Sequence, residues 1–466
     1  MFPLRTERFQ KSVLAKFLLV LIGLTALAAQ AAPRKDRVIV VISLDGFPAY
    51  ALDDPRLPTP TLRRLLREGV FAPMQPINPT VTWPNHTAIV TGVDAAVHQV
   101  LFNGILTRKA DGVPPIVEPW RDKEEMVHAP TIYDAAFQAG LTTAQVDWVA
   151  IYNAETINWQ FPELPNPDNP IEKELLADHT VTAEQLKTYE EGSEAWQDEI
   201  WADAAVKILE QHKPNLLLFH LLMLDNANHA YGPMSQASYT AMALLDSHVK
   251  RILDTLEKTG QASKATVIVV SDHGFRSFKH KIHPNVLLRE KGLVGGPEPL
   301  RADAWVMPNG GTAMVYVTRP ERRAELTTRL RDIFTGAEGV QRVYGPEEFA
   351  NLGIPTPAMS DQGPDLLLAA SPDYLFSNGT DGEYLTNDTG GTHGYLNTDP
   401  KMQAIFIAWG AGIPTGIQLK GISNLDVAPT IAALLGVNLP TARGHAIQEI
   451  VEKVKGHAES SIPPSH

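Results

Sequence analysis

The stretch "RVIVVISLDGF", residues 37–47, decides the fold class. Its residues 38–44 are apolar except for Ser43, and such a continuous run is typical of a parallel strand that is buried on both faces. The run stops at Asp45, which is followed by a glycine. The sequence therefore predicts a buried strand that delivers a carboxylate to one edge of a sheet.

Further runs of the same kind lie along the chain. They are "PNLLLFHLLML" ending at Leu224, "ATVIVVS" ending at Ser271 and "QAIFIAW" ending at Trp409, with "PDLLLAA" from Pro364 as a weaker fifth. Helical patterns separate these runs, at residues 60–69, 198–212, 239–260 and 424–436. Alternation of strands and helices predicts an α/β fold, with parallel strands in one sheet and helices on both of its faces.

Two stretches break the alternation. Residues 104–195 and 276–390 do not follow a simple strand–helix repeat. We expect them to be insertions on the loop side of the sheet, where a lid or substrate wall would form. The predicted organisation is one catalytic domain over residues 33–450, interrupted by these two insertions and followed by a tail at 451–466.

The N-terminus has the pattern of an export signal. Four basic residues, the last of them Lys16, precede the apolar run "FLLVLIGLTALAA" and the small residues around Ala31. The apolar run from Phe17 to Ala32 is 16 residues long, short of the roughly 20 that span a bilayer. We therefore expect a signal peptide over residues 1–31, cleavage after Ala31 or Ala32, a periplasmic protein, and no membrane span after cleavage.

Charge and cysteine content restrict the chemistry. The formal net charge is −13, which does not favour nucleic-acid polymers or anionic membranes as partners. The chain has no cysteine, so disulfides and thiolate ligands are excluded and any metal must be held by His, Asp or Glu. A small-molecule substrate is the expected partner, and the oligomeric state stays open.

Candidate metal ligands follow the predicted strands. Because the carboxyl ends of parallel strands share one edge of a sheet, side chains placed there converge. Each one alone is more often a turn cap or a surface residue. A mixture of imidazoles and carboxylates favours zinc, although manganese and iron stay open on ligand type alone. The candidates are Asp45 after the first strand, Asp225 and His229 after the second, Asp272 and His273 after the third, and His393 before the last.

The chain resembles the nucleotide pyrophosphatase/phosphodiesterase family of the alkaline phosphatase superfamily. The resemblance covers nearly the whole mature chain and is carried by "DGF" at 45, "PTVTWPNHTAIVTG" at 79–92, "LFNG" around Asn103, "DNANHAYGP" at 225–233, "SDHGF" at 271–275 and "THGYLNTDPKMQAIFIAWG" at 392–410. It implies an alkaline phosphatase-like three-layer αβα sandwich with a mainly parallel central sheet and cap insertions on its loop side.

The resemblance also implies the site residues. Thr82 would be the nucleophile, and Asn103 would donate its amide N–H to a phosphoryl oxygen. Two Zn²⁺ ions are implied, one held by Asp45, Thr82, Asp272 and His273, and the other by Asp225, His229 and His393. A threonine hydroxyl needs activation by a base or a metal, and a helix start favours an anion. The implied reaction is hydrolysis of a phosphodiester or pyrophosphate bond through a phosphothreonine intermediate.

The substrate class is less defined. Trp83 is a candidate stacking wall or a core aromatic, and Trp148 and Tyr152, together with Trp159, are candidate substrate contacts. The family's Trp-Pro-Gly-Ser signature is replaced here by "VDWVAIY", which puts nucleotide preference in doubt. No monoesterase arginine pattern surrounds Arg108 or Arg276. A phosphomonoesterase, a phosphonate hydrolase and, as a different class, a non-catalytic phosphate or zinc binder are the alternatives.

Overall fold

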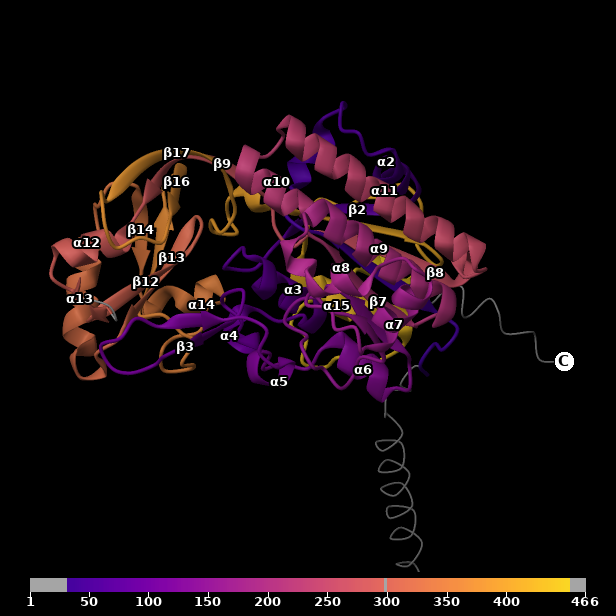
Figure 1. The fold of residues 1–466 in the computed structure, drawn as a ribbon, viewed down its shortest axis with the longest axis horizontal. Coiled ribbons are helices and arrows are strands. Elements are labelled where there is room, and N and C mark those ends of the chain that lie inside the picture. Colours follow the sequence, from indigo (N-terminus) through magenta and orange to yellow (C-terminus); the bar gives the residue numbers. More distant parts are fainter. Residues whose placement is uncertain (1–31, 297–299, 453–466) are drawn as a thin grey trace, which may run out of the picture.

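The computed structural model describes residues 32–296 and 300–452 (Figure 1). The predicted signal peptide at residues 1–31 and most of the predicted tail at 451–466 lie outside the described residues. In the part of the chain that is described, no helix combines the length and the apolar sequence that a bilayer crossing requires.

A nine-stranded sheet forms the centre of the molecule. Its strand order is β19-β2-β18-β8-β1-β7-β5-β6, and β20 pairs with β2. Strand β1 lies in the middle of this order and pairs parallel with both β7 and β8. The bounds are β1 (Val38–Leu44), β2 (Val70–Gln75), β5 (Thr143–Val146), β6 (Trp159–Phe161), β7 (Leu216–Leu221), β8 (Ala265–Val270), β18 (Ala404–Gly410), β19 (Ile417–Gln418) and β20 (Ile422–Ser423).

The structure corrects three strand predictions. Strand β18 runs antiparallel to both β8 and β2, so its prediction as a parallel strand is wrong. A buried apolar run looks the same in either direction, which is why the sequence could not show this. The weaker fifth run is β15 (Leu366–Ala370), which belongs to a separate antiparallel sheet. Strands β5 and β6 extend the central sheet from within residues 104–195, and at four and three residues they are too short to give a clear apolar run.

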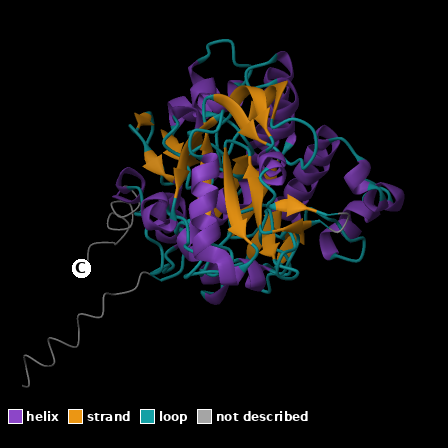
Figure 2. Ribbon diagram, turned by 90° about the vertical axis from the view of Figure 1, so that its left-hand side faces the viewer, coloured by secondary structure: helices purple, strands orange, loops and turns teal. Residues whose placement is uncertain are grey.

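Helices cover both faces of the central sheet, and Figure 2 shows the strands lying between helical layers. Alternate residues of β1 point to opposite faces, so Val40 and Ile42 pack in one core and Ile39 and Val41 in the other. The first face carries α2 (Pro60–Glu68), α7 (Pro170–Ala177), α9 (Glu194–Gln211) and α11 (Gln236–Lys258); the second carries α3 (Thr82–Thr91), α6 (Ile132–Gln138) and α15 (Val427–Leu435). The result is the predicted three-layer αβα sandwich.

A second lobe is built mainly from residues 276–392 and lies to the left in Figure 1. It has its own apolar core, which includes Val306, Val315 and Leu368. Its strands are β9 (Arg276–Ile282), β10 (Val294–Gly295), β11 (Arg301–Ala302), β12 (Ala304–Asn309), β13 (Thr312–Val317), β14 (Val340–Tyr344), β15, β16 (Asp373–Phe376) and β17 (Leu385–Thr392), and its helices are α12 (Pro284–Glu290), α13 (Arg323–Phe334) and α14 (Phe349–Leu352).

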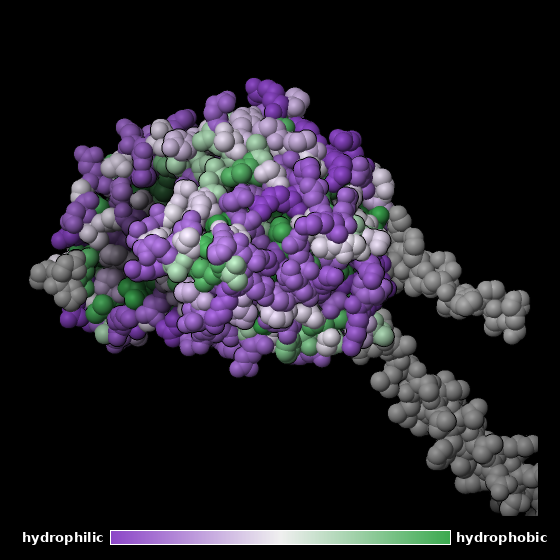
Figure 3. Space-filling view, turned by 45° about the vertical axis from the view of Figure 1, so that its right-hand side comes forward, coloured by the Kyte–Doolittle hydropathy of each residue, from purple (hydrophilic) through white to green (hydrophobic). Residues whose placement is uncertain are grey.

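Short elements complete the chain. A two-stranded sheet pairs β3 (Ile105–Thr107) with β4 (Ile116–Glu118), and Leu106 of β3 packs against Met314 and Tyr316 of the second lobe. The remaining helices are α4 (Ala95–His98), α5 (Lys123–Met126), α8 (Ala183–Lys187) and α10 (Met223–Tyr231). On the face shown in Figure 3, hydrophobic residues form small separate groups within a mainly hydrophilic surface.

Candidate active site

The ends of β1 and β8 deliver three of the predicted ligands to one place. Asp45 follows β1 directly, and Asp272 and His273 follow β8 after Ser271. All three side chains are fully buried. Gly46 and His273 both donate their main-chain N–H to Asp272 Oδ1, at 3.1 and 2.9 Å, which fixes that carboxylate.

The predicted second strand ends earlier than expected. Strand β7 stops at Leu221, and Met223 and Leu224 already belong to α10. Asp225 and His229 therefore lie on a helix, one turn apart, with His229 Nε2 3.3 Å from Asp225 Oδ2. The apolar run continues across this boundary because both the strand and the helix start are apolar, so run length alone could not place the end of the strand.

His393 comes from the second lobe. It follows β17 directly, and β9 begins three residues after His273. The chain thus enters and leaves the second lobe beside the site. His393 stacks on His273 with ring centroids 3.8 Å apart. These contacts bring residues from both lobes into one cluster.

Hydrogen bonds fix the orientation of the three histidines. The Nδ1 atoms of His229, His273 and His393 lie 3.1, 3.2 and 2.9 Å from the main-chain oxygens of Gly391, Gly274 and Thr80. A carbonyl oxygen only accepts, so each Nδ1 carries the hydrogen. Each Nε2 then offers a lone pair, which is the arrangement of a metal-binding histidine with its second nitrogen anchored.

The ligand atoms form two overlapping groups. In the first, Asp45, Asp272 and His273 offer atoms within 4.8 Å of one another. In the second, Asp225, His273 and His393 do so. Asp272 Oδ2 lies 3.1 Å and Asp45 Oδ1 3.6 Å from His273 Nε2. His273 belongs to both groups. His229 belongs to neither, although its Nε2 lies 3.3 Å from Asp225 Oδ2 of the second group.

The electrostatics of the cluster call for a cation. Within residues 32–296 and 300–452, the buried oxygens Asp45 Oδ1, Asp225 Oδ1 and Asp272 Oδ2 have no hydrogen-bond partner. Burial, and then the charge of Asp45, raises the pKa of Asp225 and of Asp272 well above the usual range. Burial also lowers the pKa of His273 to about 4, which keeps its ring neutral. Unpaired carboxylates beside neutral imidazoles fit divalent metal ions.

Thr82 lies at the rim of this cluster. It is the first residue of α3, it is 7% exposed, and its Oγ1 lies 3.5 Å from His273 Nε2. His86, one turn later, faces the Thr82 main-chain oxygen and Ser43 Oγ, each at 2.9 Å. The Thr80 hydroxyl donates to Tyr395 O at 2.6 Å. The hydroxyl of Thr82 thus faces the ligands, while its neighbours hold the helix start in place.

Asn103 approaches the same helix start. Its Oδ1 accepts the Trp83 main-chain N–H at 3.1 Å. The side chain is exposed, and its NH₂ group makes no hydrogen bond within the described part of the chain. Asn103 therefore holds a free amide donor next to Thr82.

The aromatic candidates differ in exposure. Trp83 is 5% exposed and packs with Val100 and Met126, so little of its ring face is open to a ligand. Trp148 is 2% exposed and contacts His86 edge-on, with ring centroids 4.8 Å apart. Trp148 and the half-buried Tyr152 line a cavity of about 210 Å³. Trp159 stacks on His212, with ring centroids 3.6 Å apart, so one face of it is already covered.

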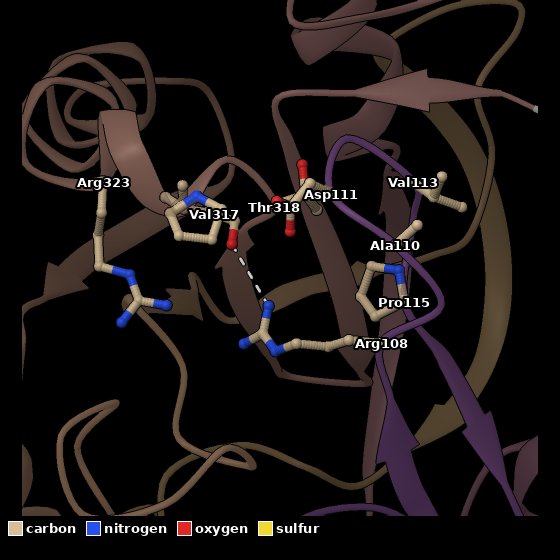
Figure 4. Close-up of a pocket in the computed structure, with 9 residues that line it drawn as sticks. Arg108, Ala110, Asp111, Val113, Pro115, Val317, Thr318 and Arg323 are labelled. Carbon is tan, nitrogen blue, oxygen red and sulfur yellow. Dashed lines mark hydrogen bonds between the residues drawn. The ribbon is translucent and has the colours of Figure 1, made fainter.

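The two arginines considered for a monoesterase role, Arg108 and Arg276, bond to residues outside the set of candidate ligands. Arg276 pairs with Asp399 at 2.7 Å. Arg108 points into a cavity of about 190 Å³ beside the second lobe, where it donates to Val317 O at 3.3 Å and lies across from Arg323 (Figure 4). None of the six candidate ligands lines that cavity.

Three buried residues next to the site escaped the sequence reasoning. His220 Nε2 lies 3.0 Å from Asp45 Oδ2, and its Nδ1 lies 2.9 Å from Asp147 Oδ2. Asp198 accepts the N–H groups of Leu222 and Met223 at the start of α10. The one available signal was the histidine inside the apolar run "LLLFHLL", because a polar side chain on a buried strand needs a partner.

Comparison with known proteins agrees with this architecture. The family model of type I phosphodiesterase / nucleotide pyrophosphatase matches residues 39–396. Human ectonucleotide pyrophosphatase/phosphodiesterase family member 1 is 24% identical over 408 residues, which cover 85% of this chain but only 40% of the human protein. Human family member 5 is 23% identical over 440 residues, covering 91% of this chain and 80% of that protein.

A solved structure shares the fold. Murine ectonucleotide pyrophosphatase/phosphodiesterase 5, in an inactive form in complex with AMP, superposes with a TM-score of 0.67 at 18% sequence identity, covering 89% of this chain and 99% of that one. The family model covers most of the chain, including the whole second lobe and all the candidate ligands. The chain therefore belongs to the type I phosphodiesterase / nucleotide pyrophosphatase family.

Proposed function

We propose that the protein is a two-zinc phosphodiesterase that hydrolyses phosphodiester or pyrophosphate bonds of small molecules through a phosphothreonine intermediate. The observation that carries this proposal is Thr82. Its hydroxyl lies at a helix start, 3.5 Å from a histidine whose Nε2 faces buried carboxylates with unpaired oxygens. A protein that only bound phosphate or zinc would need the ligands but not this hydroxyl.

The residues would divide the work as follows. Asp45, Asp272 and His273 with Thr82 would hold one ion, and Asp225, His229 and His393 the other. Two bound cations would polarise the phosphoryl oxygens and lower the pKa of the Thr82 hydroxyl. The Thr82 hydroxyl would give its proton to solvent, and Oγ1 would bond to phosphorus while the bond to the leaving oxygen breaks. The leaving oxygen would depart with the bonding electrons and take up a proton from solvent. A water molecule would then attack the same phosphorus, the bond from phosphorus to Thr82 Oγ1 would break, and Oγ1 would take the proton that the water loses. The two displacements would together retain the configuration at phosphorus.

The start of α3 and Asn103 would stabilise the charge that develops. Of the first N–H groups of α3, the Trp83 N–H is bonded to Asn103 and Pro84 has none. The Thr82 N–H and the helix dipole would therefore be the parts of the helix start that favour an anion. The free NH₂ group of Asn103, whose oxygen is fixed by Trp83 N–H, adds a donor for a non-bridging phosphoryl oxygen.

A diester is favoured over a monoester as substrate. A monoester carries an extra negative charge, and Arg108 and Arg276 are both engaged elsewhere. A nucleotide diester is the first choice because the murine relative was solved with AMP. The stretch "VDWVAIY" keeps a tryptophan, the buried Trp148, but changes the turn that follows it, so nucleotide preference stays open.

The test compares three substrates: p-nitrophenyl thymidine 5′-phosphate, bis-p-nitrophenyl phosphate and p-nitrophenyl phosphate. Zinc-loaded wild type, Thr82→Ala and a control, Thr91→Ala, are assayed together. Thr91 is a buried threonine of the same helix, and its hydroxyl donates to Thr87 O and accepts the Val93 N–H, away from the candidate ligands. We expect rapid cleavage of the diesters, slow cleavage of the monoester, loss of at least a thousandfold in Thr82→Ala, and an active control.

Other outcomes would replace the proposal. Preference for the monoester would make the protein a phosphatase. Turnover by Thr82→Ala at the wild-type rate would exclude a phosphothreonine intermediate. Zinc binding without turnover of any substrate would favour the binder.

A further inference from the structure

A histidine outside the proposed ligand set joins Asp45 to a second buried carboxylate. His220 lies on β7 and is 2% exposed. Its Nε2 lies 3.0 Å from Asp45 Oδ2. Its Nδ1 lies 2.9 Å from Asp147 Oδ2 and 3.0 Å from the Asp147 main-chain oxygen. Asp147, His220 and Asp45 thus form a continuous polar chain beneath the metal site.

Both ring nitrogens of His220 act as donors. The Asp147 main-chain oxygen can only accept, so Nδ1 carries a hydrogen. An unprotonated Nε2 would direct its lone pair at Asp45 Oδ2, which is also an acceptor. The ring therefore donates one N–H to Asp45 Oδ2 and the other to the Asp147 main-chain oxygen. The Asp147 carboxylate lies beside the ring as an ion-pair partner, with Oδ2 2.9 Å from Nδ1. The hydrogen bond to Asp45 is charge-assisted and buried.

This contact assigns separate tasks to the two oxygens of Asp45. Oδ2 is held by His220. Oδ1 has no hydrogen-bond partner within the described residues and lies 3.6 Å from His273 Nε2. Because one oxygen is anchored, the carboxylate cannot rotate freely, and the other oxygen stays directed at the ligand cluster.

The His220 ring is enclosed by residues of β1, of α3 and of the segment that follows β5. Ser43 of β1 is its partner in the parallel register, on the face that packs against α3. His86 of α3 contacts the ring edge-on, with centroids 4.5 Å apart, and is itself bonded to Ser43. Asp147 follows β5 in a left-handed conformation, φ 54°, one residue beyond the β5–β7 pair Val146–Phe219. The backbone thus turns the Asp147 carboxylate toward His220.

We propose that His220, held in turn by Asp147, is a positioning residue that fixes the Asp45 carboxylate for metal binding. This inference rests on the metal-dependent function proposed above. Residues that hydrogen-bond to metal ligands commonly change metal affinity tenfold to a hundredfold when they are removed. His220 and Asp147 would do this from the sheet interior, without touching substrate.

The test uses full-length protein and three variants at the chain. His220→Leu removes both donors, while His220→Gln keeps an amide N–H that can reach Asp45. Asp147→Asn removes the carboxylate behind the ring. The control is His248→Leu on α11, because His248 is also fully buried but neither of its nitrogens makes a hydrogen bond in the described ranges.

Zinc affinity is measured by competition with a chromophoric chelator, and the visible spectrum of the Co²⁺-loaded protein reports on ligand geometry. We expect zinc affinity to fall by about tenfold to a hundredfold in His220→Leu, with a changed cobalt spectrum. His220→Gln should recover part of the affinity, Asp147→Asn should show a smaller loss, and His248→Leu should match the wild type.

Each result decides the question. Wild-type affinity and spectrum in folded His220→Leu would overturn the inference. If His220→Leu does not fold, wild-type values in both His220→Gln and Asp147→Asn would overturn it instead. A wild type that binds zinc and turns over diesters while the variants are unchanged refutes only this inference. A wild type that binds neither zinc nor cobalt refutes the proposed function as well.

Discussion

At the scale of single residues, Asn103 carries two groups for which we propose different tasks. Its oxygen accepts the Trp83 N–H, and its NH₂ group makes no hydrogen bond within the described residues. Removal of one such donor from a transition-state contact usually costs about a hundredfold to a thousandfold in turnover. We expect a loss of that size in kcat for Asn103→Ala, measured on bis-p-nitrophenyl phosphate, with the zinc content unchanged.

A second substitution separates the two groups of Asn103. Asn103→Asp keeps an oxygen acceptor for Trp83 N–H but replaces the donor with a negative charge. If the donor matters for catalysis, this variant is at least as impaired as Asn103→Ala. Near wild-type turnover of Asn103→Asp would instead show that Asn103 only anchors α3.

His98 provides a residue-scale prediction about pH. Its side chain is fully buried, Val100 donates its N–H to Nδ1, and burial lowers the pKa of His98 to about 3. In the unfolded chain His98 has a pKa near 6.5 and binds a proton more readily than in the folded protein. The preference of the fold for neutral His98 therefore contributes fully to the free energy of unfolding above pH 6.5. It is lost progressively as the pH falls from about 6.5 toward 3.

The variant His98→Asn isolates this effect, because the amide oxygen can accept from Val100 but cannot be protonated. Below pH 6.5, each pH unit costs the wild type about 1.4 kcal/mol that the variant does not lose. Urea unfolding at pH 7.5 and pH 5.5 should therefore show the stability gap between the two proteins changing by about 1 kcal/mol in favour of the variant. A gap that does not depend on pH would contradict the assignment.

At the scale of elements, sequence reasoning was reliable where one pattern has one meaning. Strand β1 ends at Leu44 as predicted, and β8 ends at Val270, one residue before its predicted end at Ser271, so Asp45, Asp272 and His273 could be placed after these strands. The direction of a strand and the position of its end could not be predicted in the same way. A buried apolar run does not show whether β18 is parallel or antiparallel to β8. The apolar run of β7 continues into α10, so it does not show where the strand ends. The contact between His220 and Asp147 could not be predicted, because β5 and β7 are far apart in the sequence and become neighbours only in the folded sheet.

Helix α10 carries Asp225 and His229, and its start depends on another helix. Asp198 of α9 accepts the N–H groups of Leu222 and Met223 at 2.8 and 3.1 Å. Asp198→Ala leaves both part-buried donors without this partner, which costs about 1–3 kcal/mol. Urea unfolding of Asp198→Ala should show this loss. Asp203→Ala, on the same helix, removes only a part-exposed ion pair with Arg251 and should cost under about 1 kcal/mol.

At the scale of the whole molecule, the proposed metal site joins two lobes. The chain passes into the second lobe after His273 and returns at His393, and these two rings stack on each other. Asp225 Oδ1 lies 3.9 Å from His393 Nε2. Ions bound here would therefore tie α10 and the central sheet to the segment that follows β17.

Metal removal should for this reason lower the stability of the entire fold. A ligand that binds only the folded state stabilises it by about 3 kcal/mol at a hundred times its dissociation constant and about 4 kcal/mol at a thousand times. Treatment with EDTA should lower the midpoint of thermal unfolding, and zinc should restore it.

The variant Asp272→Asn tests whether these carboxylates hold the ions. Its remaining oxygen can still accept from Gly46 and His273, while one of the mutually repelling carboxylates is gone. Without metal this variant should unfold at a higher temperature than the wild type, and zinc should shift it less. An equal zinc shift in both proteins, or none in the wild type, would mean that the carboxylates at the end of the sheet do not hold the ions.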